Sequence, residues 1–117
     1  MRIIVTGANG FIGRALVEAL LAQNEHEVVA VDTVAPSSNG LNGASWVCAD
    51  ICDPDVISSL FHEPCDALVH LATLPGGAAE ENREQAREVN IDATLDLLEA
   101  VRSPGLLPRV VFASSIA

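Results

Sequence analysis

The chain has 117 residues, half of them apolar and 19% charged, which is typical of one globular domain and excludes a disordered segment. Sixteen acidic residues against six basic ones give a formal net charge of -10, the wrong sign for a protein that binds DNA, RNA or an anionic membrane. No apolar run is long enough to span a bilayer, and the first residues lack the apolar core of a signal peptide. We therefore expect a cytoplasmic protein.

Two residue types are missing from the chain. All six basic residues are arginine, so there is no lysine, and there is no tyrosine. A reaction that needs a tyrosine as acid or base, or a lysine beside it, cannot be completed by these residues alone.

Strands and helices are predicted to alternate along the chain. Strands are expected over residues 2–6, 27–32, 45–49, 66–72 and 109–113, and helices over 11–22, 54–62 and 80–102. Asp53 is expected to cap the second helix, whose first position is Pro54. The strands are nearly all apolar rather than alternating, which is typical of a parallel sheet covered on both faces. The sequence thus predicts an α/β fold built on a doubly wound parallel sheet.

The spacing of apolar residues predicts which helix faces turn toward the core. In the first helix these residues are Ile12, Leu16, Ala19 and Leu20, and in the long third helix they are Ala86, Val89, Asn90, Ala93, Leu97 and Val101. Before the long helix, the Pro-Gly-Gly run at residues 75–77 is expected to form a loop.

Four polar residues fall on predicted core elements or strand ends. Asn90 needs a partner, because an unpaired buried amide costs about 1–3 kcal/mol. Either a structural hydrogen bond to the backbone of a neighbouring strand or a role near the active site would supply one, and the sequence leaves both open. His70 is expected to be a packed core histidine rather than a base. Ser114 is expected to face the core, whereas Ser115 lies at the carboxyl end of a strand, where parallel sheets bind ligands.

Three glycines at intervals of three separate the first strand from the first helix. Gly7, Gly10 and Gly13 allow a sharp turn, a close approach of a diphosphate to backbone amides, and tight packing of the helix on the sheet. The free amides at the start of the helix would face the anion. Asp32 ends the next strand, nineteen residues after Gly13, where a ribose hydroxyl would need an acceptor. A carboxylate at this position repels a 2′-phosphate, so the sequence favours NAD over NADP.

Two plainer interpretations accompany these motifs. The glycines would also suit a tight turn with no ligand, and Asp32 would then be a solvated carboxylate. Cys48, Cys52, His62 and Cys65 follow no common spacing of structural zinc sites, so we interpret the cysteines as buried thiols of a reducing compartment and expect no metal.

Five segments resemble the extended short-chain dehydrogenase/reductase family, the NAD-dependent sugar epimerases and dehydratases. They are TGANGFIG at 6–13, DI at 50–51, HLAT at 70–73, VNIDAT at 89–94 and FASSIA at 112–117, in the family's order. The resemblance implies a Rossmann-type sheet of about five strands, incomplete at its C-terminal end. Residues 1–117 would be a single NAD(P)-binding domain, the N-terminal part of a longer member. The run at 75–80 is more similar to sugar-acid dehydrogenases of the erythronate type than to nucleotide-sugar epimerases.

The resemblance also implies site residues. The cofactor-binding residues would be Gly7, Gly10, Phe11, Ile12, Gly13, Asp32, Asp50, Ile51, Leu71, Ala72, Thr73 and Asn90. Asp50 and Ile51 would contact the adenine, and the residues from Leu71 to Thr73 the nicotinamide half. Ser115 matches the serine that bonds the reacting oxygen of the substrate, and the family's YxxxK pair has no counterpart in these residues.

Two functions are compatible with these observations. The first is the NAD-binding portion of an oxidoreductase or epimerase that acts on the hydroxyl of a small sugar or sugar acid. The alternative is a catalytically silent dinucleotide-binding or redox-sensing module that is complete at 117 residues. A chain that ends at a strand tip leaves an apolar sheet edge uncovered, which favours the first function, although self-association into a homo-oligomer would hide the same surface.

Overall fold

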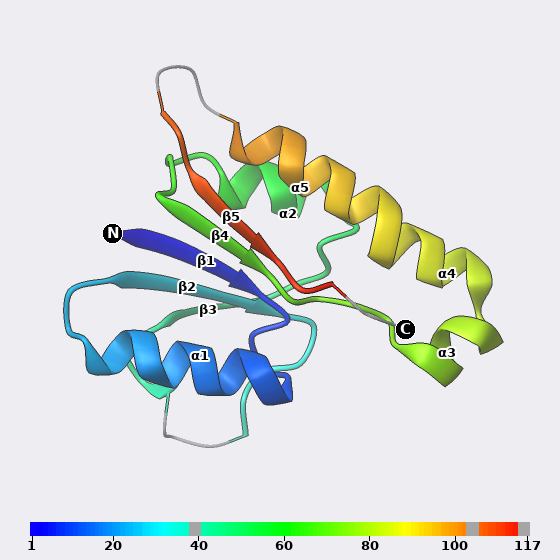
Figure 1. Cartoon of the computed structure of the whole chain (residues 1–117), viewed down its shortest axis with the longest axis horizontal. Helices are drawn as coiled ribbons and strands as arrows, with labels where there is room; N and C mark the ends of the chain where they lie inside the picture. The colour runs from blue at the N-terminus through cyan, green and yellow to red at the C-terminus, as the bar shows by residue number, and fades with distance from the viewer. Residues whose placement is uncertain (38–40, 103–105, 115–117) are drawn as a thin grey trace.

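A computed structural model describes residues 1–37, 41–102 and 106–114, and it shows one parallel sheet (Figure 1). The described strands are β1 (Arg2–Thr6), β2 (Glu27–Asp32), β3 (Ser45–Cys48), β4 (Ala67–His70) and β5 (Arg109–Phe112). The helical elements are α1 (Phe11–Ala22), α2 (Pro54–Leu60), α3 (Gly76–Glu81), α4 (Arg83–Arg87), the π-helical segment η2 (Glu88–Asp92) and α5 (Ala93–Val101). The α/β fold and the parallel sheet are confirmed, with the strands within about two residues of the expected ranges.

Helices cover the sheet on two faces. Helix α1 lies on one face, and α2 and α5 lie on the other (Figure 1). Successive residues of β1 point to opposite faces, so Ile3 and Val5 pack in the core beneath α1, whereas Ile4 packs in the core beneath α2 and α5. The sheet is therefore doubly wound, as the uninterrupted apolar strands predict.

The order of the strands is β3-β2-β1-β4-β5, and every described pair is parallel. From β1 the chain winds outward through β2 to β3 and then returns to the other side of β1 at β4. The order thus reverses between β1 and β4. Loops leave the carboxyl ends of these strands in opposite directions and open a crevice, which is where sheets of this kind bind ligands.

Helices α1 and α2 show how local sequence sets the helix ends and faces. Asp53 caps α2 as expected, because its side chain accepts a hydrogen bond of 2.9 Å from the amide of Asp55. In α1 the buried residues are Gly13 and Val17, whereas Ile12 is 64% exposed. The expectation that Ile12 and Ala19 face the core is wrong, because both are exposed, while Leu16 and Leu20 do pack against the core beneath α1. Gly13 must lie against the glycine turn, and this requirement sets the rotation of the helix.

The expected long helix is present from Arg83 to Val101 as α4, η2 and α5, but it begins later than expected, and the expectation of a loop at 75–77 is wrong. Helix α3 already begins at Gly76, and Asn82 leaves the helical conformation with φ -137° and ψ 84°. The Asn82 side chain then accepts a hydrogen bond from the amide of Gln85 and so starts α4. Further along, η2 replaces one α-helical turn. An asparagine can either continue a helix or cap the start of a new one with its side chain, and composition alone does not show which of these Asn82 does.

Strand β5 lies at the edge of the sheet, and all its residues are exposed. Ser114, which follows it, is also exposed, so the expectation that it faces the core is wrong. The physical reason is that no described element packs over this end of β5. Ser115 lies outside the described residues.

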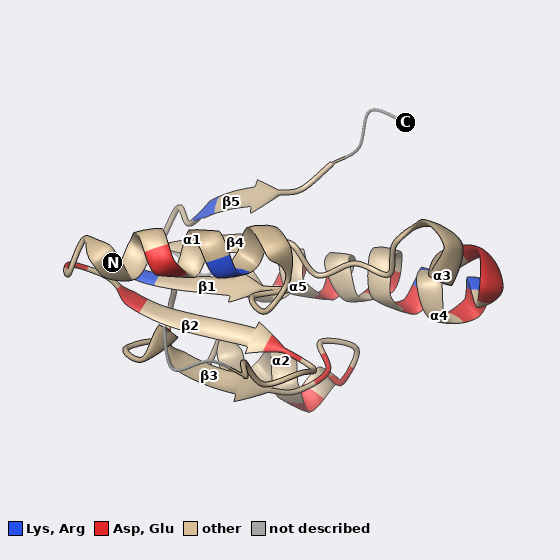
Figure 2. Cartoon of the chain, turned by 90° about the horizontal axis from the view of Figure 1, so that it is seen from below, with Lys and Arg blue, Asp and Glu red and all other residues tan. Residues whose placement is uncertain are grey.

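Acidic residues are concentrated in α3 and α4, at the end of the molecule toward which the strands run (Figure 2). Arginines are sparse along the same view. Among the described residues, none of the helices is both long enough and apolar enough to cross a membrane.

Candidate functional site

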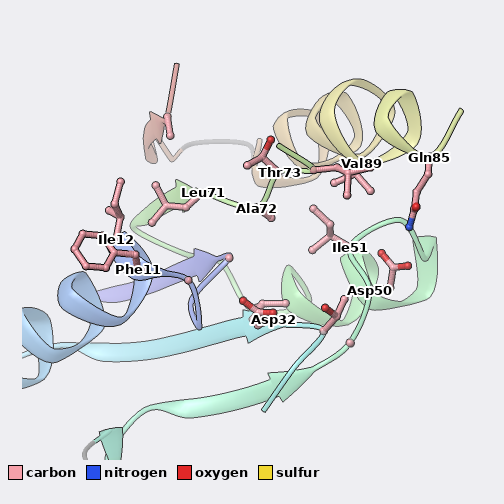
Figure 3. A pocket seen from close by; sticks show the side chains of 18 residues that line it. Phe11, Ile12, Asp32, Asp50, Ile51, Leu71, Ala72, Thr73, Gln85 and Val89 are labelled. Atoms are coloured by element: carbon pink, nitrogen blue, oxygen red, sulfur yellow. The ribbon is translucent and has the colours of Figure 1, made fainter. Parts of the chain in front are cut away.

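A cavity of about 560 Å³ opens at the carboxyl ends of the strands, beside the point where the strand order reverses (Figure 3). It is lined by eleven of the twelve residues that the sequence assigns to a cofactor: Gly7, Gly10, Phe11, Ile12, Gly13, Asp32, Asp50, Ile51, Leu71, Ala72 and Thr73. Segments that are far apart in the chain are thus brought around one hollow.

Seven further residues line the cavity without having been predicted. They are Val31, Thr33, Ala49, Leu74, Gln85, Val89 and Ala113. Most are neighbours in the chain of predicted residues. Gln85 and Val89 come from α4 and η2, and their spacing of four residues places them on one helical face, which was the available signal.

The glycine turn touches the segment after β4 directly. Gly7 has φ +68°, a conformation that favours glycine, and a Cβ built on it would lie 2.7 Å from the backbone nitrogen of Ala72. A Cβ on Gly13 would overlap the carbonyl oxygen of Gly7 and would lie 2.8 Å from Cα of Ala8. Both glycines are therefore needed by the protein's own packing.

Gly10 differs from these two glycines. A Cβ built on it would meet a single atom within 4 Å, the carbonyl oxygen of Gly7 at 3.3 Å, and the residue lies on the cavity wall. Gly10 is also the residue before α1, and no side chain caps the helix there. The first amides of α1 thus lie at the cavity wall, where an anion would satisfy them.

Asp32 is held in place by backbone amides from two loops. Its Oδ2 accepts a hydrogen bond of 2.9 Å from the amide of Asn9, and its Oδ1 accepts one of 3.1 Å from the amide of Val34. The Asn9 side chain donates to the carbonyl of Val34 at 3.1 Å and joins the same two loops. Each carboxylate oxygen has further lone pairs, so Asp32 retains the capacity to accept from a ligand hydroxyl.

The far wall of the cavity carries Asp50 and Ile51. Asp50 accepts a hydrogen bond from the amide of Cys52 at 2.9 Å, and Ile51 is buried against the core. Burial and the neighbouring Asp50 raise the pKa of the Cys52 thiol to about 11. Because the thiolate is the reactive form, this pKa disfavours Cys52 as a redox sensor.

The cysteines only partly match the expectation of buried thiols. Cys65 is buried and Cys52 is half-buried, but Cys48 is exposed, and all three are free. Cys48 lies on β3, an edge strand of the sheet, which explains its exposure. In the described part of the chain, no group of three or more His, Cys, Asp or Glu residues is placed to hold a metal ion.

Asn90 bonds the segment that follows β4. Its Oδ1 accepts hydrogen bonds from the hydroxyl of Thr73 at 3.0 Å and from the amide of Leu74 at 2.8 Å, and its Nδ2 donates to the carbonyl of Leu74 at 3.0 Å. Asn90 itself does not line the cavity. Asn90 therefore makes a structural hydrogen bond to backbone, the first of the two explanations given above for this residue. The bonded backbone is that of Leu74, which lies beyond the end of β4.

His70 is buried at the end of β4, as expected of a core histidine, with 3% of its surface exposed. Its Nδ1 lies 2.6 Å from the hydroxyl of Thr6, and its Nε2 lies 2.7 Å from the hydroxyl of Thr94. The ring also stacks against Phe112. Burial lowers the pKa of His70 below its usual value, so the neutral imidazole is favoured.

Comparison with known proteins matches residues 3–117 to the model of the NAD dependent epimerase/dehydratase family. The chain belongs to this family. The family assignment agrees with the five segments quoted above and with the cavity, to which each of the five contributes at least one residue.

Among curated relatives, the chain is 36% identical to a D-erythronate dehydrogenase of Cupriavidus necator and 32% identical to one of Haemophilus influenzae. In both cases the match includes 100% of this chain, but only 39% and 38% of the relatives. The chain thus spans about two fifths of the length of these relatives.

Solved structures show the same architecture. The chain aligns over its whole length with a nucleoside-diphosphate-sugar epimerase from Agrobacterium tumefaciens, at a TM-score of 0.86 and 29% identity, and covers 38% of that chain. It also resembles a UDP-glucose 4-epimerase of Thermus thermophilus that was solved in complex with NAD, with a TM-score of 0.75 and 32% identity, covering 93% of this chain and 36% of that one.

Proposed function

We propose that this chain is the NAD-binding part of an oxidoreductase or epimerase that acts on the hydroxyl of a sugar or sugar acid. The observation that carries the proposal is Gly10. A Cβ built on Gly10 would meet one protein atom within 4 Å, the carbonyl oxygen of Gly7 at 3.3 Å, and it would lie at a cavity wall formed by the uncapped end of α1. A diphosphate that approaches the backbone closely needs such a position.

The cavity residues divide among the parts of a dinucleotide. The turn from Gly7 to Gly13 would hold the diphosphate, with Phe11 and Ile12 donating their amides, and Asp32 would accept from the adenosine ribose. Asp50 and Ile51 would contact the adenine. The segment from Leu71 to Thr73 would support the nicotinamide half, with Asn90 behind it. Once bound, NAD would supply the acceptor or donor of a hydride.

NAD is proposed in preference to NADP. Asp32 lies at the cavity with both carboxylate oxygens fixed by backbone amides, so it cannot move aside to admit a 2′-phosphate without losing these hydrogen bonds. The chain has no arginine between Arg14 and Arg83 that would bind such a phosphate from the adjacent loop.

The relatives support the proposed substrate class, since two are D-erythronate dehydrogenases and others are sugar epimerases. Ser115 is proposed to orient the substrate. The tyrosine and lysine that the family resemblance implies for catalysis are absent from these 117 residues, so we expect the chain alone to bind NAD without measurable turnover. We also propose a cytoplasmic location, with which three free thiols agree.

Binding is tested by titrating the 117-residue chain with NAD and NADP in a calorimeter, with two matched glycine variants. Gly10→Ala adds a methyl group at the cavity wall and is expected to weaken NAD binding by about tenfold. Gly77→Ala adds the same group where nothing lies within 4 Å, so its NAD affinity should equal that of the wild type. Equal affinities of all three proteins for NAD, or no binding by the wild type, would refute the proposal.

A further inference from the structure

The hydrogen bonds around His70 fix the direction in which each hydroxyl donates. The hydroxyl oxygen of Thr6 accepts from the amide of Leu71 at 3.2 Å and from that of Ala72 at 3.3 Å. The amide of Leu71 is shared with the backbone carbonyl of Thr6 at 3.1 Å, and both amides use the hydroxyl oxygen as an acceptor. Its own hydrogen has one remaining partner, Nδ1 of His70 at 2.6 Å, which must act as an acceptor.

The opposite side of the ring gives the same answer independently. The hydroxyl of Thr94 donates to the backbone carbonyl of Asn90 at 3.0 Å. Its oxygen is then an acceptor toward Nε2 of His70 at 2.7 Å, so Nε2 must carry the proton. Two separate hydroxyl groups thus require one neutral tautomer, with the proton on Nε2 and a bare Nδ1.

This chain of hydrogen bonds ends at the cavity wall. The amides of Leu71 and Ala72 belong to the backbone against which Gly7 packs, and the segment from Leu71 to Leu74 lines the cavity. At its other end the chain of bonds reaches the carbonyl of Asn90, whose side chain holds Leu74 by two hydrogen bonds. His70 thus connects the two groups that fix the position of this segment.

We propose that His70 is a positioning residue for the NAD pocket, which acts as the Nε2-protonated tautomer through Thr6 and Thr94 to hold the segment from Leu71 to Leu74 in place. This inference deepens the proposed function and rests on it. His70 lines no part of the cavity, so its effect on NAD is indirect. The bonded residues lie on β1, β4 and α5, and the imidazole joins them over sequence separations of 64 and 24 residues.

Two variants of His70 test the hydrogen bonds of its two ring nitrogens separately. The amide of an asparagine reaches the position of Nδ1 and still accepts from Thr6, whereas the amide of a glutamine reaches the position of Nε2 and still donates to Thr94. His70→Gln leaves the buried hydroxyl of Thr6 without an acceptor, and we expect it to weaken NAD binding by about tenfold. His70→Asn keeps the side that holds Leu71 and Ala72, so its loss of NAD affinity should be smaller.

A core variant supplies the structural control. Val101→Ala removes buried volume at the far end of α5 and should reduce the free energy of unfolding while leaving the NAD affinity within about twofold of the wild type. If the two His70 variants also lose stability but bind NAD like Val101→Ala, then His70 is merely structural and the proposal is refuted. If His70→Gln does not fold, Thr6→Val and Thr6→Ser form a second pair, of which only the serine variant keeps the hydroxyl and should retain NAD affinity.

The tautomer is measured without NAD by nitrogen-15 NMR of the imidazole in the wild-type chain. A protonated Nε2 and a bare Nδ1 support the proposal, while a proton on Nδ1 overturns it. His70→Gln should shift the amide signals of Leu71 and Ala72 more than His70→Asn does. If the wild-type chain does not bind NAD, the proposed function and the role of His70 are both refuted. If the wild type binds NAD and the His70 variants bind it equally well, only the role of His70 is refuted.

Discussion

Asp32 is the residue on which the choice of dinucleotide depends. Both of its carboxylate oxygens accept hydrogen bonds from backbone amides, and these bonds hold the carboxylate at the cavity rim. We expect Asp32→Ala to weaken NAD binding by roughly 10- to 100-fold, the value of a hydrogen bond to a charged group. Asp32→Asn keeps an oxygen acceptor but loses the charge, so the ratio of NAD to NADP affinity should fall in this variant. Calorimetric titration of each variant with NAD and with NADP measures these affinities. An unchanged preference for NAD over NADP in both variants would contradict the proposed role of Asp32.

His70 should make the stability of the chain depend on pH. Burial lowers its pKa in the folded state below the usual 6.5, so the unfolded chain binds more protons than the folded chain as the pH falls below that value. The free energy of unfolding should therefore be largest above pH 6.5. The part of the unfolding free energy that is linked to His70 should be lost as the pH falls from 6.5 through the folded pKa. The loss should be at most about 1.4 kcal/mol per pH unit for one proton. Urea unfolding at several pH values measures this slope.

His70→Asn is the control for the pH experiment, because asparagine does not titrate. The pH dependence of its unfolding free energy should be weaker than that of the wild type between pH 7.5 and pH 5, a range chosen to bracket the usual histidine value of about 6.5. Identical slopes in the two proteins would mean that protonation of His70 is not coupled to folding.

At this scale the sequence predicts local chemistry better than remote contacts. The glycine turn and Asp32 were predictable, because the constraints on a strand, a turn and a helix lie within a few residues. The bonds from His70 to Thr6 and Thr94 were not, because they join residues 64 and 24 positions apart, and only the fold brings these side chains together. The burial of His70 could be predicted from the sequence, but its hydrogen bonds to Thr6 and Thr94 could not.

The helical arm from Gly76 to Val101 is the element whose form the sequence predicts least well. Residues 80–102 are rich in good helix formers, so propensity alone favours one continuous helix. The cap at Asn82 interrupts it, and the π-helical segment η2 contains Asn90. Single π-helical turns often occur at functional sites, and here the turn bears the side chain that bonds Leu74.

The two asparagines of this arm should therefore behave differently on substitution. Asn90→Ala leaves the amide and carbonyl of Leu74 without their partner, and we expect the free energy of unfolding to fall by about 1–3 kcal/mol and the NAD affinity to fall with it. Asn82→Ala removes an exposed helix cap and should cost about 1 kcal/mol without changing NAD affinity. Denaturant unfolding and NAD titration of both variants check this. A loss of NAD affinity in Asn82→Ala equal to that in Asn90→Ala would show that the whole arm, rather than the bond to Leu74, supports the pocket.

Over the whole molecule, the sequence was sufficient to predict the class of fold and the end of the sheet that carries the candidate site. Uninterrupted apolar strands require cover on both faces, and the structure places α1 on one face and α2 and α5 on the other. The order of the strands depends on which strand pairs with β1 after the third crossover. That choice is not encoded in any single segment, which is why the reversal between β1 and β4 appears only in the structure.

The edge formed by β5 predicts how the 117-residue chain behaves in solution. Its apolar residues Val110, Val111 and Phe112 are 36%, 48% and 55% exposed, and an edge strand has backbone groups free to pair with another chain. We expect the chain to associate with itself as its concentration rises, through β5, despite the repulsion from a net charge of -10. Sedimentation velocity over a concentration series measures this association. Val111→Lys places a charge on the edge strand and should weaken it, whereas Leu95→Lys makes the same change of charge on the exposed face of α5 and should have the smaller effect. Equal effects of the two substitutions would indicate that net charge, and not the sheet edge, governs association.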